Sequence, residues 1–159
     1  VCSGQNPSRN AGDVRMTLSE IQRNRLIQRQ LCLECSPSYL SAPDSVIQEE
    51  YNGCGPDSLN PWIRHILTDE LHRFGPAFQI HDHDFTESTG FYADFTAANK
   101  RLGDNCRAIV AAADVSDHNR DELYLTCELI EDACQWFGWP GYRDHAKVAE
   151  VEPGPEVLA

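Results

Sequence analysis

Apolar residues recur at helical spacing over most of this chain. The clearest segment lies between residues 74 and 85, where Phe74, Phe78, His81 and Phe85 are spaced four, three and four positions apart. Residues at these intervals share one face of an α-helix. The pattern therefore predicts a buried helix in which one position, normally filled by a hydrophobic side chain, carries an imidazole.

Two longer segments show the same periodicity and predict the main framework of the fold. One runs from about residue 92 to 113, and the other from about 123 to 137, ending near Gly138 and before Pro140. Their apolar stripes are Phe95, Leu102, Cys106, Ile109 and Ala113 in the first, and Leu123, Cys127, Ile130, Cys134 and Phe137 in the second. Because no segment alternates convincingly between apolar and polar residues, the fold class we expect is mainly α.

Local signals predict the remaining helices and turns. Thr17-Leu18-Ser19-Glu20 matches a capping box and predicts a helix to about Leu33. Asn60-Pro61 predicts a helix to about His72. Residues 117–121 have the composition of a turn with capping residues. We expect the aromatic residues near the end of the last helix to lie in the core and at the helix end; they are Trp136, Phe137 and Trp139.

The 159 residues predict a single domain with loose ends. Residues 1–15 are polar and rich in Gly, Asn and Ser, so we expect a flexible arm. Residues 16–145 form the expected helical domain, and residues 146–159 are expected to be a disordered acidic tail. The chain begins with Val1 and shows no cleavable leader, which predicts an already matured form.

The charge of the chain restricts its partners. The formal net charge is −12, whereas nucleic-acid binding requires clustered Lys and Arg side chains. The same charge disfavours strongly anionic membranes but is compatible with zwitterionic lipid or a divalent cation. No apolar run approaches the roughly 20 residues of a transmembrane helix. We therefore expect no nucleic acid, no transmembrane segment and a monomer.

Seven cysteines are many for a cytosolic protein of this size. They do not have the paired spacing of a zinc site, so we expect a secreted, extracellular protein with disulfides and one odd cysteine. Their pairing stays open. Cys106 can pair with Cys127 or Cys134, and either Cys32 or Cys35 can pair with Cys54 or Cys2.

The residues around His81 suggest hydrolytic chemistry. A neutral imidazole can take a proton from water as a general base, and a carboxylate from a neighbouring helix can fix its tautomer. Asp104, on an alanine-lined face of the second long helix, is the candidate for this role, with Asp94 as its competitor. Asp82 points about 100° away from His81 and could bind Ca²⁺ together with the glycine-rich loop 52–55. This set predicts metal-assisted hydrolysis of an ester by water.

Residues 74–85, with the sequence Phe-Gly-Pro-Ala-Phe-Gln-Ile-His-Asp-His-Asp-Phe, resemble the His-Asp signature of secreted phospholipases A2. Residues 51–55, Tyr-Asn-Gly-Cys-Gly, resemble the calcium loop of that family. Residues 95–104 and 127–137 are similar to later helices of its bacterial and fungal branch. The resemblance covers roughly residues 50–138. It implies two long antiparallel, disulfide-linked helices with additional helices and a calcium loop.

The resemblance also implies a function and a set of site residues. The expected activity is calcium-dependent hydrolysis of the sn-2 ester of a glycerophospholipid at a membrane or micelle surface. His81 would be the base, Asp104 the second member of the dyad and Asp82 a calcium ligand. The carbonyl of Gly53, with Gly55 or the side chain of Asn52, would complete the Ca²⁺ site.

The chain also departs from the family pattern, and these departures keep alternatives open. Phe78 stands where the family has a cysteine bonded to the loop cysteine, Asp84 where many members have another cysteine, and Phe85 where a tyrosine is usual. The stretch from Cys54 to His81 is also long. A non-catalytic binding protein with the same fold is therefore the alternative.

A third possibility is a zinc hydrolase that uses His81 and His83 as a pair. This pairing would require a strand, because alternate residues share one face only in a strand. In a helix His83 lies about 200° away from His81, which predicts a surface residue.

Overall fold

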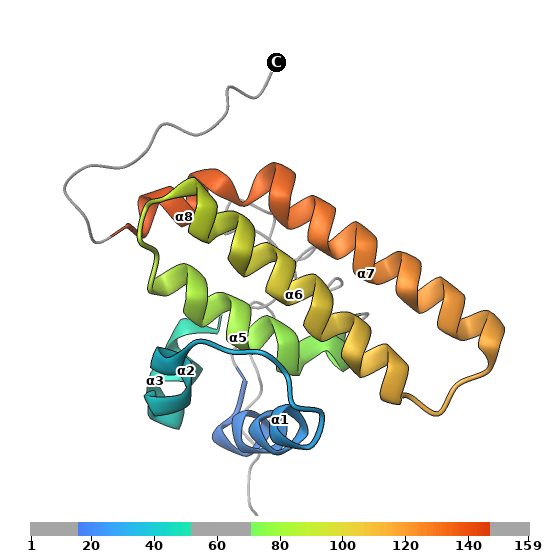
Figure 1. Ribbon diagram of the computed structural model, residues 1–159. Helices are drawn as coiled ribbons and strands as arrows, with labels where there is room; N and C mark the ends of the chain where they lie inside the picture. Colours follow the sequence, from blue (N-terminus) through green and yellow to red (C-terminus); the bar gives the residue numbers. More distant parts are fainter. Residues whose placement is uncertain (1–15, 52–70, 147–159) are drawn as a thin grey trace, which may run out of the picture.

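The computed structural model describes residues 16–51 and 71–146, and these residues contain helices and no strand. The mainly α class is therefore confirmed for the described part of the chain (Figure 1). The elements are α1 (Leu18–Gln30), α2 (Pro37–Ser41), α3 (Asp44–Glu50), the 3-10 turn η1 (His72–Phe74), α5 (Gly75–Thr86), α6 (Tyr92–Ala112), α7 (Asp117–Phe137) and α8 (Trp139–Asp144).

Helix α5 lies at the centre of the arrangement. On one side it packs against α6, which in turn packs along the antiparallel α7 (Figure 1). On its other side lie α1, α2 and α3, and α8 contacts α5, α6 and α7 at one end. Because α5 has neighbours on both sides, polar residues on either face of this helix are removed from solvent.

The core has three parts that follow from this arrangement. One lies among α5, α6 and α7 and includes Phe78, Leu102 and Cys127. A second joins α1, α2 and α3 to α5 and includes Ile21 and Ile80. The third is an aromatic cluster where α6 meets α8, made of Phe95, Trp139 and Tyr142 with Phe85 and Tyr92 packed against it.

The predicted start of α1 is confirmed in atomic detail. The backbone N–H of Glu20 donates to Thr17 Oγ1 at 3.3 Å, and the backbone N–H of Thr17 donates to Glu20 Oε2 at 2.7 Å. The helix ends at Gln30 rather than at the expected Leu33. Cys32 has a φ of 53°, a left-handed conformation that ends the helical path.

The last long helix begins earlier than expected. Residues 117–121 form the first turn of α7 and not a separate turn, because Ser116 caps the helix by accepting from the backbone N–H of Asn119. A further helix, α8, follows Gly138 directly. Pro140 lies in its first turn, where a missing N–H group has no structural cost.

The aromatic residues at the end of α7 divide between core and surface. Trp139 is buried as expected, but Trp136 and Phe137 are 65% and 67% exposed, so their predicted core position is wrong. The side of α7 that faces α6 carries Cys127, Ile130 and Cys134. Trp136 lies about 120° from Ile130 around the helix, and no described element covers that side.

The expected disulfide between the long helices is not found among the described cysteines, which are Cys32, Cys35, Cys106, Cys127 and Cys134. Cys106 and Cys127 nevertheless lie against each other, both fully buried between α6 and α7. A hydrogen bond with Cys106 lowers the pKa of the Cys127 thiol. Cys2 and Cys54 lie outside the described residues.

Within residues 16–51 and 71–146, no helix is both long and apolar enough to cross a membrane.

Candidate active site around His81

His81 lies in the interior of the protein because of its place on α5. The helix is buried from Gly75 through His81, and the imidazole is flanked by the ring of Phe85 at a centroid distance of 4.2 Å. The residue is 7% exposed. An imidazole in such surroundings needs polar partners, because burial removes its hydrogen bonds to water.

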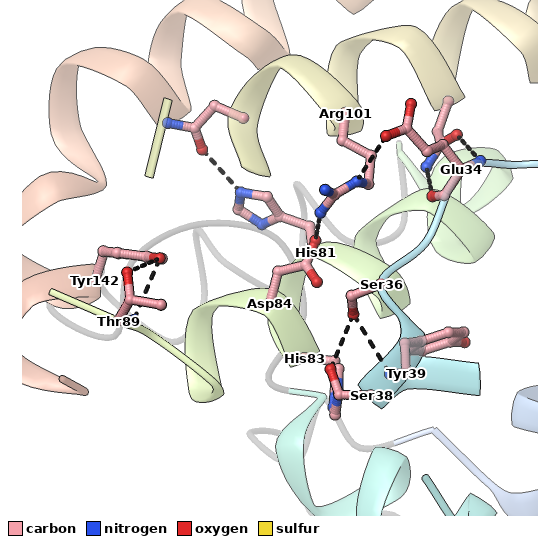
Figure 2. A network of polar contacts seen from close by, with 12 residues as sticks. Glu34, Ser36, Ser38, Tyr39, His81, His83, Asp84, Thr89, Arg101 and Tyr142 are labelled. Carbon is pink, nitrogen blue, oxygen red and sulfur yellow. Dashed lines mark hydrogen bonds and ion pairs between the residues drawn. The ribbon is translucent and has the colours of Figure 1, made fainter. Parts of the chain in front are cut away.

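The partner of His81 is Asn99 on α6. Nε2 of the ring lies 2.9 Å from Asn99 Oδ1, and Asn99 Nδ2 donates to Gln135 Oε1 at 3.1 Å. Gln135 in turn donates from Nε2 to the hydroxyl of Tyr92 at 2.9 Å. Because Asn99 Oδ1 can only accept, Nε2 carries the ring proton and Nδ1 keeps its lone pair. Figure 2 shows the His81 ring with this contact as a dashed line.

Asp82 lies on the Nδ1 side of the imidazole. Its Oδ1 is 3.9 Å from Nδ1, beyond hydrogen-bonding distance, and its side chain is 13% exposed. The carboxylate also affects Cys134 on α7. Burial, with an added repulsion from the charge of Asp82, raises the pKa of the Cys134 thiol to about 12. The lone pair of His81 and a largely buried carboxylate therefore occur side by side.

The structure does not bring Asp104 to His81, so this predicted pairing is corrected. Asp104 is on the exposed side of α6 and pairs with Lys100 at 2.5 Å and with Arg107 at 3.0 Å. It follows Asn99 by five residues, which places it about 140° further around the helix. The competing candidate, Asp94, accepts from Thr89 Oγ1 at 2.6 Å at the start of α6.

Three of the four expected calcium ligands lie outside the part of the chain that the structure describes. Asn52, Gly53 and Gly55 lie outside the described residues, and only Asp82 is described. Among the described residues, no group of three or more His, Cys, Asp or Glu side chains is arranged to hold a metal ion. A Ca²⁺ site at Asp82 would thus depend on oxygen atoms from elsewhere, such as the backbone carbonyls of the loop.

The three departures from the phospholipase pattern have clear structural roles. Phe78 is a core residue between α5 and α6. Phe85 packs against His81, Phe95 and Tyr142. Asp84 forms an ion pair with Arg101, which also reaches Glu34 at 3.4 Å (Figure 2). Each replacement therefore makes packing or charge contacts of its own.

His83 is 3% exposed, so its predicted surface position is wrong. Its Nδ1 is 2.7 Å from Glu50 Oε2, and its Nε2 is 3.2 Å from Ser38 Oγ. These partners come from α3 and α2, on the side of α5 opposite to Asn99. The two histidines thus point in different directions, and the structure does not form the His81–His83 zinc pair.

Sequence reasoning missed Asn99, although a signal for it was present. Phe95, Asn99, Leu102 and Cys106 are spaced four, three and four apart, the same spacing that identified His81 on its own helix. Both polar residues interrupt an apolar stripe, and the two stripes face each other where α5 packs on α6. Glu50 and Ser38 had no comparable signal, because α2 and α3 are too short to show periodicity.

Comparisons of the chain with protein-family models, with curated proteins and with solved structures find no significant match.

Proposed function

We propose that this protein is a phospholipase A2-like hydrolase in which His81 activates water for attack on the sn-2 ester of a glycerophospholipid. One observation carries the proposal. The proton of His81 is held on Nε2 by Asn99, so that the lone pair of Nδ1 is free to accept a proton beside the carboxylate of Asp82. The resemblance of residues 74–85 and 51–55 to secreted phospholipases A2 adds the substrate class.

The residues of the site have separate roles in this reaction. Nδ1 of His81 takes a proton from water as the oxygen bonds to the ester carbonyl, and later returns it to the leaving alkoxide. Asn99 orients the ring and fixes its tautomer, and Gln135 fixes the orientation of the Asn99 amide. Oδ1 of Asp82 lies 3.9 Å from Nδ1, so its negative charge is close to the imidazolium that forms. Because Asn99 is neutral, it adds no charge opposite the imidazolium.

Asp82 fits a role in binding Ca²⁺, which prefers oxygen ligands. Its carboxylate is largely buried and acts on Cys134 as a charged group. With the loop residues Asn52, Gly53 and Gly55 it would hold the ion. Bound Ca²⁺ supplies polarisation of the ester carbonyl and stabilisation of the oxyanion. The proposal includes action outside the cell, where millimolar calcium and lipid surfaces are available.

The decisive assay measures fatty-acid release from mixed phospholipid vesicles, with millimolar calcium and with a chelator. We expect release by the wild type with calcium and none with the chelator. The variant His81→Gln should keep the fold and lose turnover, since an amide cannot act as a base at neutral pH. His118→Gln is the matched control, because His118 is exposed on α7 far along the chain from the site. Hydrolysis that persists with the chelator or in His81→Gln would contradict the mechanism.

A non-catalytic binding protein is the second candidate, and Asn99 is the observation that favours it. A neutral amide holds the imidazole in place without stabilising its charged form. Such a protein would bind calcium or lipid and release no fatty acid from any phospholipid in the same assay.

A further inference from the structure

A second polar constellation lies on the opposite face of α5 and is independent of His81. Three helices contribute one residue each: Ser38 from α2, His83 from α5 and Glu50 from α3. Glu50 Oε2 is 2.7 Å from His83 Nδ1, and Ser38 Oγ is 3.2 Å from His83 Nε2. Figure 2 shows Ser38 beside the His83 ring, with Ser36 and Tyr39 next to it. A hydroxyl, an imidazole and a carboxylate are thus joined in sequence.

The hydrogen bonds determine how the protons are distributed. A carboxylate only accepts, so Nδ1 of His83 carries the proton that is donated to Glu50. When the ring carries only this proton, Nε2 is an acceptor, and it faces the hydroxyl of Ser38. In this order the carboxylate orients the ring, and the ring can take the proton of the serine. This is the arrangement that activates a serine nucleophile.

The exposure of the three residues suits a nucleophile supported by a buried base. The side chains of His83 and Glu50 are only 4% and 11% exposed, whereas Ser38 is exposed. The ring of Tyr39 lies edge-on to His83 at a centroid distance of 5.5 Å. A substrate can reach Ser38 Oγ from solvent, while the charge that develops on His83 stays beside Glu50 in a region of low dielectric.

The neighbouring serines show that this position is distinct. Ser36 Oγ lies 3.1 Å from Ser38 Oγ, and it accepts from the backbone N–H of Tyr39 as the cap of α2. Its own proton can therefore be donated toward the nucleophile or toward an oxygen bonded next to it. Ser41, at the end of the same helix, donates its hydroxyl proton to the carbonyls of Ser38 and Pro37. Among the described residues, the ring of His83 forms its hydrogen bonds with Ser38 and Glu50 and not with Ser41.

We propose that Ser38, His83 and Glu50 form a second hydrolytic site that acts on carboxylic esters with good leaving groups. Ser38 Oγ bonds to the ester carbonyl carbon and its proton passes to His83 Nε2. The bond from carbon to the alcohol oxygen breaks, and the alkoxide takes that proton from Nε2. Water then attacks the acylated serine, loses a proton to Nε2, and releases the acid as the proton returns to Ser38. One hydroxyl donor beside the nucleophile restricts the site to activated esters.

A purely structural role predicts a different behaviour of the same residues. In that case Glu50 and His83 only attach α2 and α3 to α5, and Ser38 reacts no faster than other surface serines. The distinguishing property is thus the nucleophilicity of Ser38 in the folded protein. The site uses none of His81, Asn99 or Asp82, so it can be tested without calcium or lipid.

The experiment treats the full chain with a fluorophosphonate in the presence of a chelator and maps the modified serine by peptide mass spectrometry. Phosphorus bonds to the serine oxygen, fluoride leaves, and the proton passes to His83. We expect modification of Ser38 and not of Ser41. With p-nitrophenyl acetate we expect slow hydrolysis that Ser38→Ala abolishes and Ser41→Ala leaves unchanged. Glu50→Gln should slow the modification at least about ten-fold, because the ring loses its oriented tautomer.

Several results would overturn the proposal. They are an unmodified Ser38 in the folded wild type, equal modification of Ser38 and Ser41, and undiminished ester hydrolysis in Ser38→Ala. Because Ser38 is exposed, Ser38→Ala is expected to keep the fold, which circular dichroism verifies. We expect the fluorophosphonate to modify Ser38 in the folded protein but not after unfolding in urea. This result distinguishes a serine that the fold activates from a serine that is merely accessible.

Discussion

At the scale of single residues, His81 and Asn99 differ from a His–Asp pair by one functional group. Both partners offer an oxygen to Nε2, so both fix the same tautomer. Only a carboxylate adds a charge that stabilises the imidazolium formed during catalysis. The contact between His81 and Asn99 thus has the geometry of a His–Asp pair but lacks its negative charge.

Asn99→Asp is therefore expected to raise the rate of fatty-acid release at least about ten-fold, if His81 is the base. The same change should lower the free energy of unfolding by about 1–3 kcal/mol, because the donor to Gln135 is lost and a carboxylate is buried. Fatty-acid release and urea unfolding measure the two effects.

Asn105→Asp is the matched control, since Asn105 is buried on the same helix and bonds to the backbone of Glu34. It should lose stability without gaining activity. An equal rate increase in both variants, or none in Asn99→Asp, would exclude His81 as the rate-determining base.

Cys134 can report on the charge of Asp82. Burial and then the charge of Asp82 raise the pKa of its thiol, so removal of that charge lowers the pKa and increases the thiolate fraction. Asp82→Asn should therefore speed alkylation of Cys134 several-fold at about pH 9. Calcium bound by Asp82 offsets the same charge and should accelerate alkylation in the wild type but not in Asp82→Asn.

Asp132→Asn serves as the control for this measurement, because Asp132 is exposed on α7 and does not contribute to the pKa of Cys134. Site-specific alkylation is followed by mass spectrometry. If calcium leaves the rate for Cys134 unchanged in the wild type, Asp82 is not a calcium ligand.

The site residues that sequence could predict are those that interrupt an apolar stripe. His81 was identified this way, and Asn99 could have been. Asp104 was preferred because a carboxylate suited the chemistry and its helix face carried alanines. Only the packing of α5 against α6 shows that this face is exposed. The burial of His83 likewise depends on α2 and α3, whose positions are set by tertiary contacts.

At the scale of elements, the junction between α7 and α8 positions the aromatic cluster beside the site. A Cβ atom on Gly138 would lie 2.5 Å from the backbone oxygen of Cys134 and 3.2 to 3.3 Å from the rings of Phe95 and Phe85. Phe85 in turn packs on His81. The close approach of this turn therefore requires a residue without a side chain.

Gly138→Ala should lower the free energy of unfolding by about 1–3 kcal/mol, because backbone and rings must move to admit the methyl group. Gly141→Ala is its control on α8, where a Cβ meets nothing within 4 Å, and it should be neutral or stabilising by up to about 1 kcal/mol. Urea unfolding compares them. Equal urea concentrations at the unfolding midpoints of the two variants would show that the junction between α7 and α8 is not tightly packed.

Long helices were the elements that the sequence predicted well. Helices α5, α6 and α7 are long enough for the spacing of their apolar residues to define their inner faces. The predicted inner residues Phe95, Leu102, Cys106, Cys127 and Ile130 are all buried. The short helix α8 was missed, because Pro140 also fits the end of a preceding helix. The exposure of Trp136 and Phe137 depends on which elements cover α7, and periodicity alone cannot supply that.

At the scale of the whole molecule, the proposed function makes net charge important, because the protein would have to approach a lipid surface. The chain has 25 acidic and 13 basic residues and a formal net charge of −12. Such a molecule is repelled by an anionic surface over a distance of about 10 Å at 0.1 M salt. One Ca²⁺ ion bound at Asp82 would make this net charge less negative by only two.

We therefore expect faster fatty-acid release from phosphatidylcholine vesicles than from phosphatidylglycerol vesicles at low ionic strength. The difference should shrink as salt is raised, because screening weakens the repulsion between exposed charges. Release from both vesicles is measured at fixed calcium across a salt series, with Asp132→Asn and wild type compared to test the effect of one surface charge. A preference for phosphatidylglycerol that is strongest at low salt would contradict the expectation. It would indicate that a local basic surface, rather than the net charge, governs the encounter with lipid.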